Sequence, residues 1–175
     1  MENKVIDSLV SRRSIRSYRP EQIKDEELEA ILKAGTYAAS GRNRQSAIMV
    51  AVQDKATRDK LSKMNGAVMG REEDLFYGAP TVIIVLADKT VPTHFEDGCL
   101  VMGNLMNAAY AVGVDSCWIH RAREEFESEE GKALLREWGV ENAENYVGIG
   151  HCILGYRDCE YPKPIPRKEN YIYKV

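Results

Sequence analysis

The stretch PTVIIVLA, residues 80–87, is the clearest structural signal in this sequence of 175 residues. It is continuous, apolar and rich in β-branched side chains, which is typical of a strand covered on both faces. Three other short stretches are also predicted as strands, namely residues 47–52, 115–119 and 146–154. The sequence therefore predicts a sheet in which the strand at residues 80–87 has packing partners on either side.

Helices are predicted where apolar residues recur at helical spacing around these strands. The expected helices cover residues 3–11, 25–39, 54–64, 95–112 and 128–138. Asp25 is the expected N-cap of the second helix, and Gly139 is the expected left-handed stop after the last one. The helix over residues 95–112 is apolar all round, so we expect it to be buried in the core or at a subunit interface.

The composition is that of one soluble globular domain, which we place over residues 1–175. Hydrophobic residues make up 44% and charged residues 29%, and the formal net charge is −3. This balance argues against a disordered chain and against general binding to nucleic acid or to a membrane surface. The N-terminus has no apolar signal region, and the longest uncharged stretch, residues 98–114, is shorter than the roughly 20 residues of a membrane span. We expect a cytoplasmic protein without a membrane segment.

Two residue types that often carry chemistry have spacings that predict none here. The four cysteines are better explained as free thiols in a reducing compartment than as disulfides, and neither they nor the histidines have zinc-site spacing. His151 and Cys152 are neighbours on one predicted strand, so their side chains point to opposite faces and do not form a dyad. Gly148 and Gly150 lie inside the same strand, which argues against a dinucleotide-binding loop.

Basic residues gather near the N-terminus and again in the tail. Arg12, Arg13, Arg16 and Arg19 fall within eight positions and alternate with serines. Guanidinium groups beside a hydroxyl are what a phosphate dianion requires, because they supply paired donors and permanent charge. Lys163, Arg167 and Lys168 form a second basic group, in the tail, that can close over the same anion. The alternative is a solvated basic turn that pairs with the acids of residues 25–29.

The tail over residues 156–175 has no periodicity and contains three prolines within five positions, yet it is too apolar for a solvated end. We expect no regular element there, and a partner subunit is one candidate for the surface on which it packs. Residues 39–45 (ASGRNRQ) form a second polar cluster between a predicted helix and a strand. Its amides suit a planar heterocycle with alternating donors and acceptors, although an ordinary loop that ends a helix at Gly41 explains it equally well.

These clusters resemble the signatures of the nitroreductase family of enzymes that use flavin mononucleotide (FMN). Residues 12–18 (RRSIRSY) are similar to the family's opening motif, and residues 39–45 are similar to its second motif. Residues 97–119 resemble its central helix and the following strand, whereas residues 148–156 and 166–168 resemble its last strand and closing tail. The similarity covers nearly the whole chain in the same order.

The resemblance implies an α+β fold with a mixed, mainly antiparallel sheet flanked by helices. It also implies an intertwined homodimer that binds two FMN molecules at the subunit interface, with the tail on the partner subunit. The residues implied to hold the phosphate and ribityl side are Arg12, Arg13, Ser14, Arg16, Arg167 and Lys168. The residues implied to flank the cofactor or to pass the flavin ring with their backbone are Ser40, Asn43, Gln45, Trp118, Ile119, His120 and Arg121.

The implied activity is a ping-pong electron transfer, in which NADH or NADPH delivers hydride to N5 of the flavin and a small electron-poor acceptor, such as a nitroaromatic or a quinone, then takes the electrons. The flavin carries the hydride, so no catalytic side chain and no metal are implied. Three alternatives stay open: a flavin store or sensor, another reaction on the same fold such as reductive dehalogenation or flavin fragmentation, and an anion-binding module without flavin. Residues 46–47 and 120–121 depart from the family pattern, which usually has a proline and an aromatic residue after the glutamine.

Overall fold

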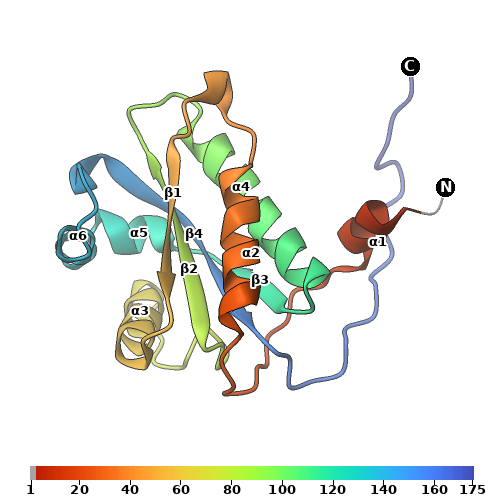
Figure 1. Ribbon diagram of the computed structural model, residues 1–175, viewed down its shortest axis with the longest axis horizontal. Helices are drawn as coiled ribbons and strands as arrows, with labels where there is room; N and C mark the ends of the chain where they lie inside the picture. The colour runs from red at the N-terminus through yellow and green to blue at the C-terminus, as the bar shows by residue number, and fades with distance from the viewer. Residues whose placement is uncertain (1–2) are drawn as a thin grey trace.

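The computed structural model describes residues 3–175 and contains one four-stranded antiparallel sheet with helices on both faces (Figure 1). The strand order is β1-β2-β4-β3, so β2 and β4 are the inner strands. The strands are β1 (Ala47–Val52), β2 (Thr81–Asp88), β3 (Asp115–Ile119) and β4 (Tyr146–Gly155). All four predicted strands are therefore confirmed. The parallel component of the expected mixed sheet is a single isolated bridge between Ser14 and Ser116.

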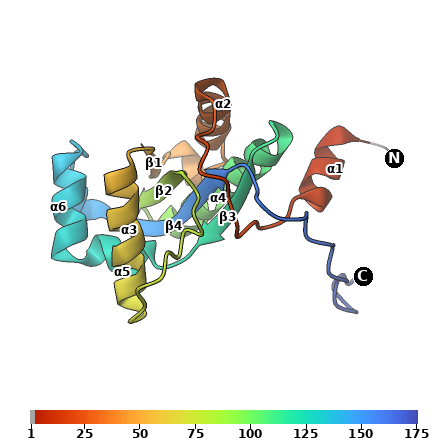
Figure 2. The same cartoon turned by 90° about the horizontal axis from the view of Figure 1, so that it is seen from below.

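Residues 3–175 contain six α-helices, of which five pack on the sheet in two groups, whereas the first of them stands apart from it (Figure 2). They are α1 (Lys4–Ser11), α2 (Asp25–Thr36), α3 (Lys55–Val68), α4 (His94–Ala111), α5 (Ala122–Glu127) and α6 (Glu129–Glu137). Helices α3, α5 and α6 share one core with one face of the sheet, and α2 and α4 share a second core with the other face. Two short 3-10 turns precede strands: Gly41–Asn43 lies between α2 and β1, and Ala143–Asn145 lies between α6 and β4.

Strand β2 confirms the expectation drawn from PTVIIVLA. Its side chains are buried from Thr81 to Ala87, and they alternate between the two cores: Ile84 faces one, and Ile83 faces the other. Strand β1 is also an apolar run of the kind suited to a buried strand, but it lies at the edge of the sheet, where most of its residues are only half-buried. An apolar run alone does not distinguish an inner strand from an edge strand.

The helix boundaries show where local signals were misread. Helix α2 begins after Lys24, because the Glu27 carboxylate accepts a hydrogen bond from the Lys24 backbone N–H, and Asp25 is already helical. Thus Asp25 is not the N-cap, and the helix ends at Thr36 instead of residue 39. Helix α5 was not predicted, since its six residues are mostly charged and too few to show a period. Gly139 has φ +75°, which confirms the left-handed stop after α6.

Helices α1 and α4 leave apolar surface uncovered. Every residue of α1 is at least partly exposed, and the exposed set includes Val5, Ile6, Leu9 and Val10. Helix α4 is buried on one side only, with Phe95 and Leu100 about half exposed on the other. The tail from Tyr156 onward has no regular element, as predicted, and runs beside α1 (Figures 1 and 2). No helix within residues 3–175 is both long and apolar enough to cross a membrane.

Candidate functional site

A basic hollow of about 750 Å³ lies between the end of α1 and the tail. Its charged and hydroxyl-bearing lining residues are Arg12, Arg13, Ser14, Arg16, Lys163 and Arg167. The structure thus brings three of the four arginines of the predicted N-terminal cluster together with two members of the basic tail group, whereas Arg19 lies outside this hollow. No acidic residue lines this hollow, so the cationic groups face one another without compensation and favour an anion.

The arginines of the hollow have different roles in the folded chain. Arg13 is tied to the backbone through Nη1, which donates to the Val10 and Arg12 carbonyls at 2.8 Å each, whereas its buried Nε has no hydrogen-bond partner in the described part of the chain. Arg12 has a buried Nη1 that has no hydrogen-bond partner among residues 3–175. Arg16 is exposed. Arg12 and Arg16 are therefore the two guanidinium groups in this cluster with the most donor capacity left for a ligand.

Tyr161 fixes the tail against the start of the cluster. Its hydroxyl accepts a hydrogen bond of 2.9 Å from the Arg13 backbone N–H and donates one of 3.0 Å to the Ser11 carbonyl. The Arg157 guanidinium lies over the Tyr161 ring, 5.1 Å from its centre. Beyond this point the tail is exposed, and Lys168 does not line the hollow but lies over the Tyr171 ring. The prediction for Lys168 is thus not supported by its position in the single chain.

The predicted second cluster forms a tight loop between α2 and β1, at the top of Figure 1. Three residues of this loop have positive φ although they are not glycines: Arg42 (53°), Asn43 (54°) and Gln45 (49°). Such left-handed conformations cost an ordinary L-residue on the order of 1 kcal/mol each, so other contacts must hold the loop. Within the loop, Ser40 Oγ accepts from the Gln45 backbone N–H, and Gln45 Nε2 donates to Asn43 Oδ1, both at 3.1 Å.

The buried carboxylate of Asp97, in the first turn of α4, holds this loop from below. It accepts hydrogen bonds from the Gly41 backbone N–H at 2.9 Å and from the Ser46 hydroxyl at 2.6 Å, and Thr93 donates a third at 3.2 Å. Burial raises the pKa of Asp97, but these hydrogen bonds outweigh burial and bring the pKa below its ordinary value. Sequence reasoning missed this role, although an acid that begins a long uncharged helix was the available signal.

The third predicted segment, Trp118 to Arg121, connects β3 to α5. Trp118 packs flat against Gly150 of β4, where an added Cβ would lie 2.2 Å from the indole nitrogen. Ile119 is buried, whereas His120 is exposed. Arg121 has φ +77°, which turns the chain sharply into α5. The Asn65 amide of α3 donates a hydrogen bond of 2.8 Å to the His120 carbonyl and so ties this corner to the core.

The basic hollow and the segment from Trp118 to Arg121 are close in space, whereas the loop over residues 40–45 is remote from both. The backbone bridge between Ser14 and Ser116 joins the basic hollow to β3, and β3 then leads over about 13 Å from Ser116 to His120. The loop over residues 40–45 is held by Asp97 at one end of α4, but the hollow lies beside Tyr110 near the other end, since the Tyr110 and Tyr161 rings are 6.3 Å apart. Tyr110 comes thirteen positions after Asp97, which corresponds to about 20 Å along the helix.

The cysteines and the central histidine fit the sequence expectations. All four cysteines are free; Cys117 and Cys152 are buried, and Cys159 is exposed. Burial raises the pKa of the Cys152 thiol, which disfavours the thiolate that a nucleophile needs. His151 lies beside Phe76 and Phe126 in the core shared with α3, α5 and α6, whereas Cys152 belongs to the core shared with α2 and α4. The prediction that these neighbours do not form a dyad is confirmed.

Comparison with known proteins identifies the family. The model of the nitroreductase family matches residues 9–72 and 66–156, which together make up most of the chain. The chain belongs to the nitroreductase family. A relative from Archaeoglobus fulgidus, which carries the name NADH dehydrogenase/NAD(P)H nitroreductase, is 33% identical over 85% of this chain and 82% of its own length. The resemblance of the arginine motif, the polar loop and the closing strand is thereby confirmed as family membership.

One solved structure is similar in fold, and a second relative is similar in sequence over part of its length. The crystal structure of a Bacteroides fragilis nitroreductase with bound FMN has a TM-score of 0.89 and 28% identity, and it covers 99% of this chain and 100% of its own. An FMN reductase [NAD(P)H] from Bacillus subtilis is 36% identical over 49% of this chain and 32% of that protein. The expected α+β fold is therefore the fold of this family.

Proposed function

We propose that this nitroreductase-family chain is an FMN-dependent oxidoreductase, which moves electrons from NADH or NADPH to small electron-poor acceptors such as nitroaromatics or quinones. The observation that carries the proposal is the basic hollow, in which Arg12, Ser14 and Arg16 meet Lys163 and Arg167. FMN ends in a phosphate dianion, and guanidinium forks with a neighbouring hydroxyl match that group in charge and in donor geometry.

The donor chemistry of the hollow fits FMN. Arg12 Nη1 is buried, and no acceptor for it lies among the described residues 3–175. A buried charged donor without a partner costs free energy, and a phosphate oxygen would remove that cost. Arg16 and Arg167 would add charge from the exposed rim. We assign the phosphate to Arg12, Ser14 and Arg16, with Arg167 as a tail contact and Arg13 as a residue that shapes the backbone.

The path along β3 also supports FMN. Phosphate, ribityl chain and ring follow one another in FMN, and the hollow, strand β3 and the His120–Arg121 corner follow one another in the same direction. Backbone groups of Trp118, Ile119, His120 and Arg121 would then pass the ring. When bound, FMN supplies the centre that accepts and gives hydride, so this chain's residues only need to bind and orient the reactants.

The homodimer is part of the same proposal. The loop with Ser40, Asn43 and Gln45 is about 20 Å along α4 from the hollow, so these residues would flank an FMN held mainly by the partner chain. The exposed apolar row on α1 and the exposed apolar tail offer the surface for such an arrangement. We propose that residues 1–175 form one domain and that residues 156–175 pack on the partner subunit.

The proposal is tested by removing the two free guanidinium groups. The double substitution Arg12→Ala and Arg16→Ala should weaken FMN binding by at least about 100-fold, measured by the quenching of flavin fluorescence on titration with apoprotein. Arg19→Ala is the matched control, because Arg19 is an exposed arginine of the same segment that does not line the hollow. Equal affinity in the double variant and the control would refute the phosphate assignment.

A second measurement separates the oxidoreductase from a flavin store or sensor. Anaerobic titration with NADH and with NADPH should bleach the absorbance of bound FMN if the chain is an oxidoreductase. Bound FMN that neither nucleotide reduces would favour the store or sensor. A protein that stays colourless with excess FMN would leave only the anion-binding module.

A further inference from the structure

Three buried polar side chains meet behind the corner where β3 turns into α5. Glu125 of α5 and His151 of β4 have fully buried side chains, and the Glu125 carboxylate lies 3.2 Å from His151 Nε2. The Asn65 amide, from α3, donates a hydrogen bond to the same carboxylate. The three residues come from three different elements and converge inside the core that also contains Phe76 and Phe126.

Such a group is costly in an apolar core. Within residues 3–175, Asn65 Oδ1 and both ring nitrogens of His151 have no partner with hydrogen-bond geometry. Apolar side chains of similar size would fill the same space without this cost, since replacement of buried polar groups by apolar ones is often neutral or stabilising. Packing alone therefore gives no reason for these three residues, and a further role has to be sought in what they contact.

One hydrogen bond connects these three buried residues to the backbone of the His120–Arg121 corner. Besides Glu125, Asn65 Nδ2 donates to the His120 carbonyl at 2.8 Å, so one amide bridges the exposed corner and the buried carboxylate. The next residue, Arg121, has the strained φ of +77°, and its carbonyl accepts from the Glu125 backbone N–H at 3.1 Å. The Asn65 side chain thus holds the corner before its sharpest turn, and the first helical hydrogen bond of α5 holds it after the turn.

The surroundings leave this corner little freedom to shift. Gly148 of β4 packs so closely on Ala122 that an added Cβ would lie 2.1 Å from the Ala122 carbonyl oxygen. Position 119 pairs with position 151 in the ladder between β3 and β4, so the strand that enters the corner is joined to the strand that carries the histidine. Strand pairing, close packing and the amide bridge act on one stretch of four residues.

We propose that Asn65, Glu125 and His151 are positioning residues that fix the His120–Arg121 backbone against the flavin ring. The inference rests on the proposed function, because it needs FMN beside this corner. A positioned N–H or carbonyl next to the reactive part of a ring affects affinity and redox balance without touching substrate, and a displacement of about 1 Å at such a point costs on the order of 100-fold in rate.

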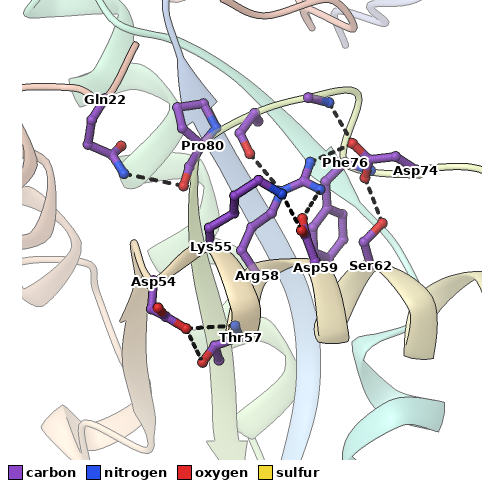
Figure 3. A network of polar contacts seen from close by, with 12 residues as sticks. Gln22, Asp54, Lys55, Thr57, Arg58, Asp59, Ser62, Asp74, Phe76 and Pro80 are labelled. Carbon is purple, nitrogen blue, oxygen red and sulfur yellow. Dashed lines mark hydrogen bonds and ion pairs between the residues drawn. The ribbon is translucent and has the colours of Figure 1, made fainter. Parts of the chain in front are cut away.

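The test compares two buried polar residues of helix α3. Asn65→Ala removes the bridge to the corner, whereas Ser62→Ala removes a buried hydroxyl one turn earlier in α3 that donates to Asp74 and not to the corner (Figure 3). Both apoproteins are compared by thermal unfolding, and the Kd and the midpoint potential of bound FMN are then measured. We expect Asn65→Ala to raise the Kd about tenfold and to shift the potential, and Ser62→Ala to leave the Kd within about twofold and the potential unchanged.

A second variant keeps the inference testable if Asn65→Ala does not fold. Glu125→Gln keeps an oxygen that accepts from Asn65 but removes the charge. Positioning by hydrogen bonds predicts a Kd within about twofold of the wild type and protection of residues 119–126 from hydrogen exchange as in the wild type. A large loss of affinity at unchanged exchange would overturn the inference, since it would assign the effect to the Glu125 charge.

The outcomes distinguish this inference from the proposed function. If the wild type binds FMN and depends on Arg12 and Arg16, but Asn65→Ala behaves as Ser62→Ala does, the positioning role is refuted and the proposed function stands. If the wild type binds no FMN, both fail. Tight FMN binding that is lost together with protection of residues 119–126 in Asn65→Ala supports both.

Discussion

Ser46 donates a hydrogen bond of 2.6 Å to the buried carboxylate of Asp97, although the two residues are 51 positions apart in the sequence. The contact explains one departure from the family pattern, since position 46 is where the family usually has proline. In this chain the serine hydroxyl adds a third donor beside the Gly41 backbone and Thr93. The loop with three left-handed residues is therefore anchored to α4 through a single side chain.

Asp97→Ala should destabilise the protein by about 2–3 kcal/mol, because it leaves the Gly41 N–H and the Ser46 hydroxyl without their acceptor. Urea unfolding followed by circular dichroism measures this difference. Ser46→Ala is the graded control, with an expected loss of about 1 kcal/mol, since Gly41 keeps its partner. A loss below about 0.5 kcal/mol in Asp97→Ala would contradict the anchoring role.

Stability at acid pH should depend on Asp74, which joins α3 to the loop before β2 (Figure 3). Burial opposes ionisation of Asp74, but hydrogen bonds from Arg58, Ser62 and two backbone N–H groups lower its pKa to about 2. Because the folded pKa is below the unfolded value, this stabilisation is present above about pH 4 and is lost as the pH falls towards 2.

Asp74→Asn should flatten that part of the stability profile. The expected loss at pH 6 is about 1 kcal/mol, which allows for the partial exposure of the carboxylate. Urea unfolding at several pH values between 2.5 and 6 is the measurement. A variant whose stability falls as steeply as that of the wild type over this range would show that other carboxylates dominate.

Glycines that look alike in the sequence should tolerate alanine very differently. In Gly148→Ala the new Cβ would lie 2.1 Å from the Ala122 carbonyl oxygen, so we expect a loss of about 3 kcal/mol or failure to fold. Gly103 lies in α4, and apart from its chain neighbours and the adjacent backbone of this helix no heavy atom of residues 3–175 lies within 4 Å of the added Cβ, so Gly103→Ala should not lower the stability of the chain. Thermal unfolding of both variants decides the matter, and equal losses would show that the packing at Gly148 is looser than described.

The apolar row of α1 predicts an oligomer that a single charge can break. Val5 is 68% exposed and lies on the strongly amphipathic helix α1, which leaves its apolar side without a partner in one chain, and it does not line the basic hollow. Val5→Asp should shift the protein towards monomer in light scattering and weaken FMN binding in parallel. Val68→Asp is the control, an exposed valine at the end of α3 on the far side of the sheet (Figure 2). A wild type that is monomeric at micromolar concentration would refute the dimer.

Patterns that are local in the sequence were sufficient for most of the fold. The buried strand over residues 80–87 and the left-handed stop at Gly139 depend on neighbouring residues alone, and both were found. The start of α2 was displaced by one residue because a side chain three positions away, Glu27, replaced the cap expected from Asp25. The order of the strands and the edge position of β1 depend on pairing across the chain and carry no local signal.

In the candidate site, too, residues that form a local pattern in the sequence were predicted, and residues that act through distant contacts were not. The arginine cluster was visible because its members are adjacent in the sequence, and Lys163 and Arg167 were found by their charge. The residues that hold the site in place were not found, because Asp97 meets Ser46 and Asn65 meets His120 only after folding. Buried polar residues of this kind look like ordinary helix residues until their partners are known.

Tyr161 has a practical consequence for anyone who handles this protein. Its hydroxyl forms hydrogen bonds with the backbone of Ser11 and Arg13, so the C-terminal tail is joined to the segment after α1 beside the basic hollow. We therefore expect an affinity tag or a proteolytic cut near residue 161 to disturb the backbone at residues 11–13. The expected result is weaker FMN binding, so that the purified protein contains less flavin and is less yellow. Tyr161→Phe, which deletes only the hydroxyl that makes these two hydrogen bonds, should reproduce that loss of colour without any change in chain length.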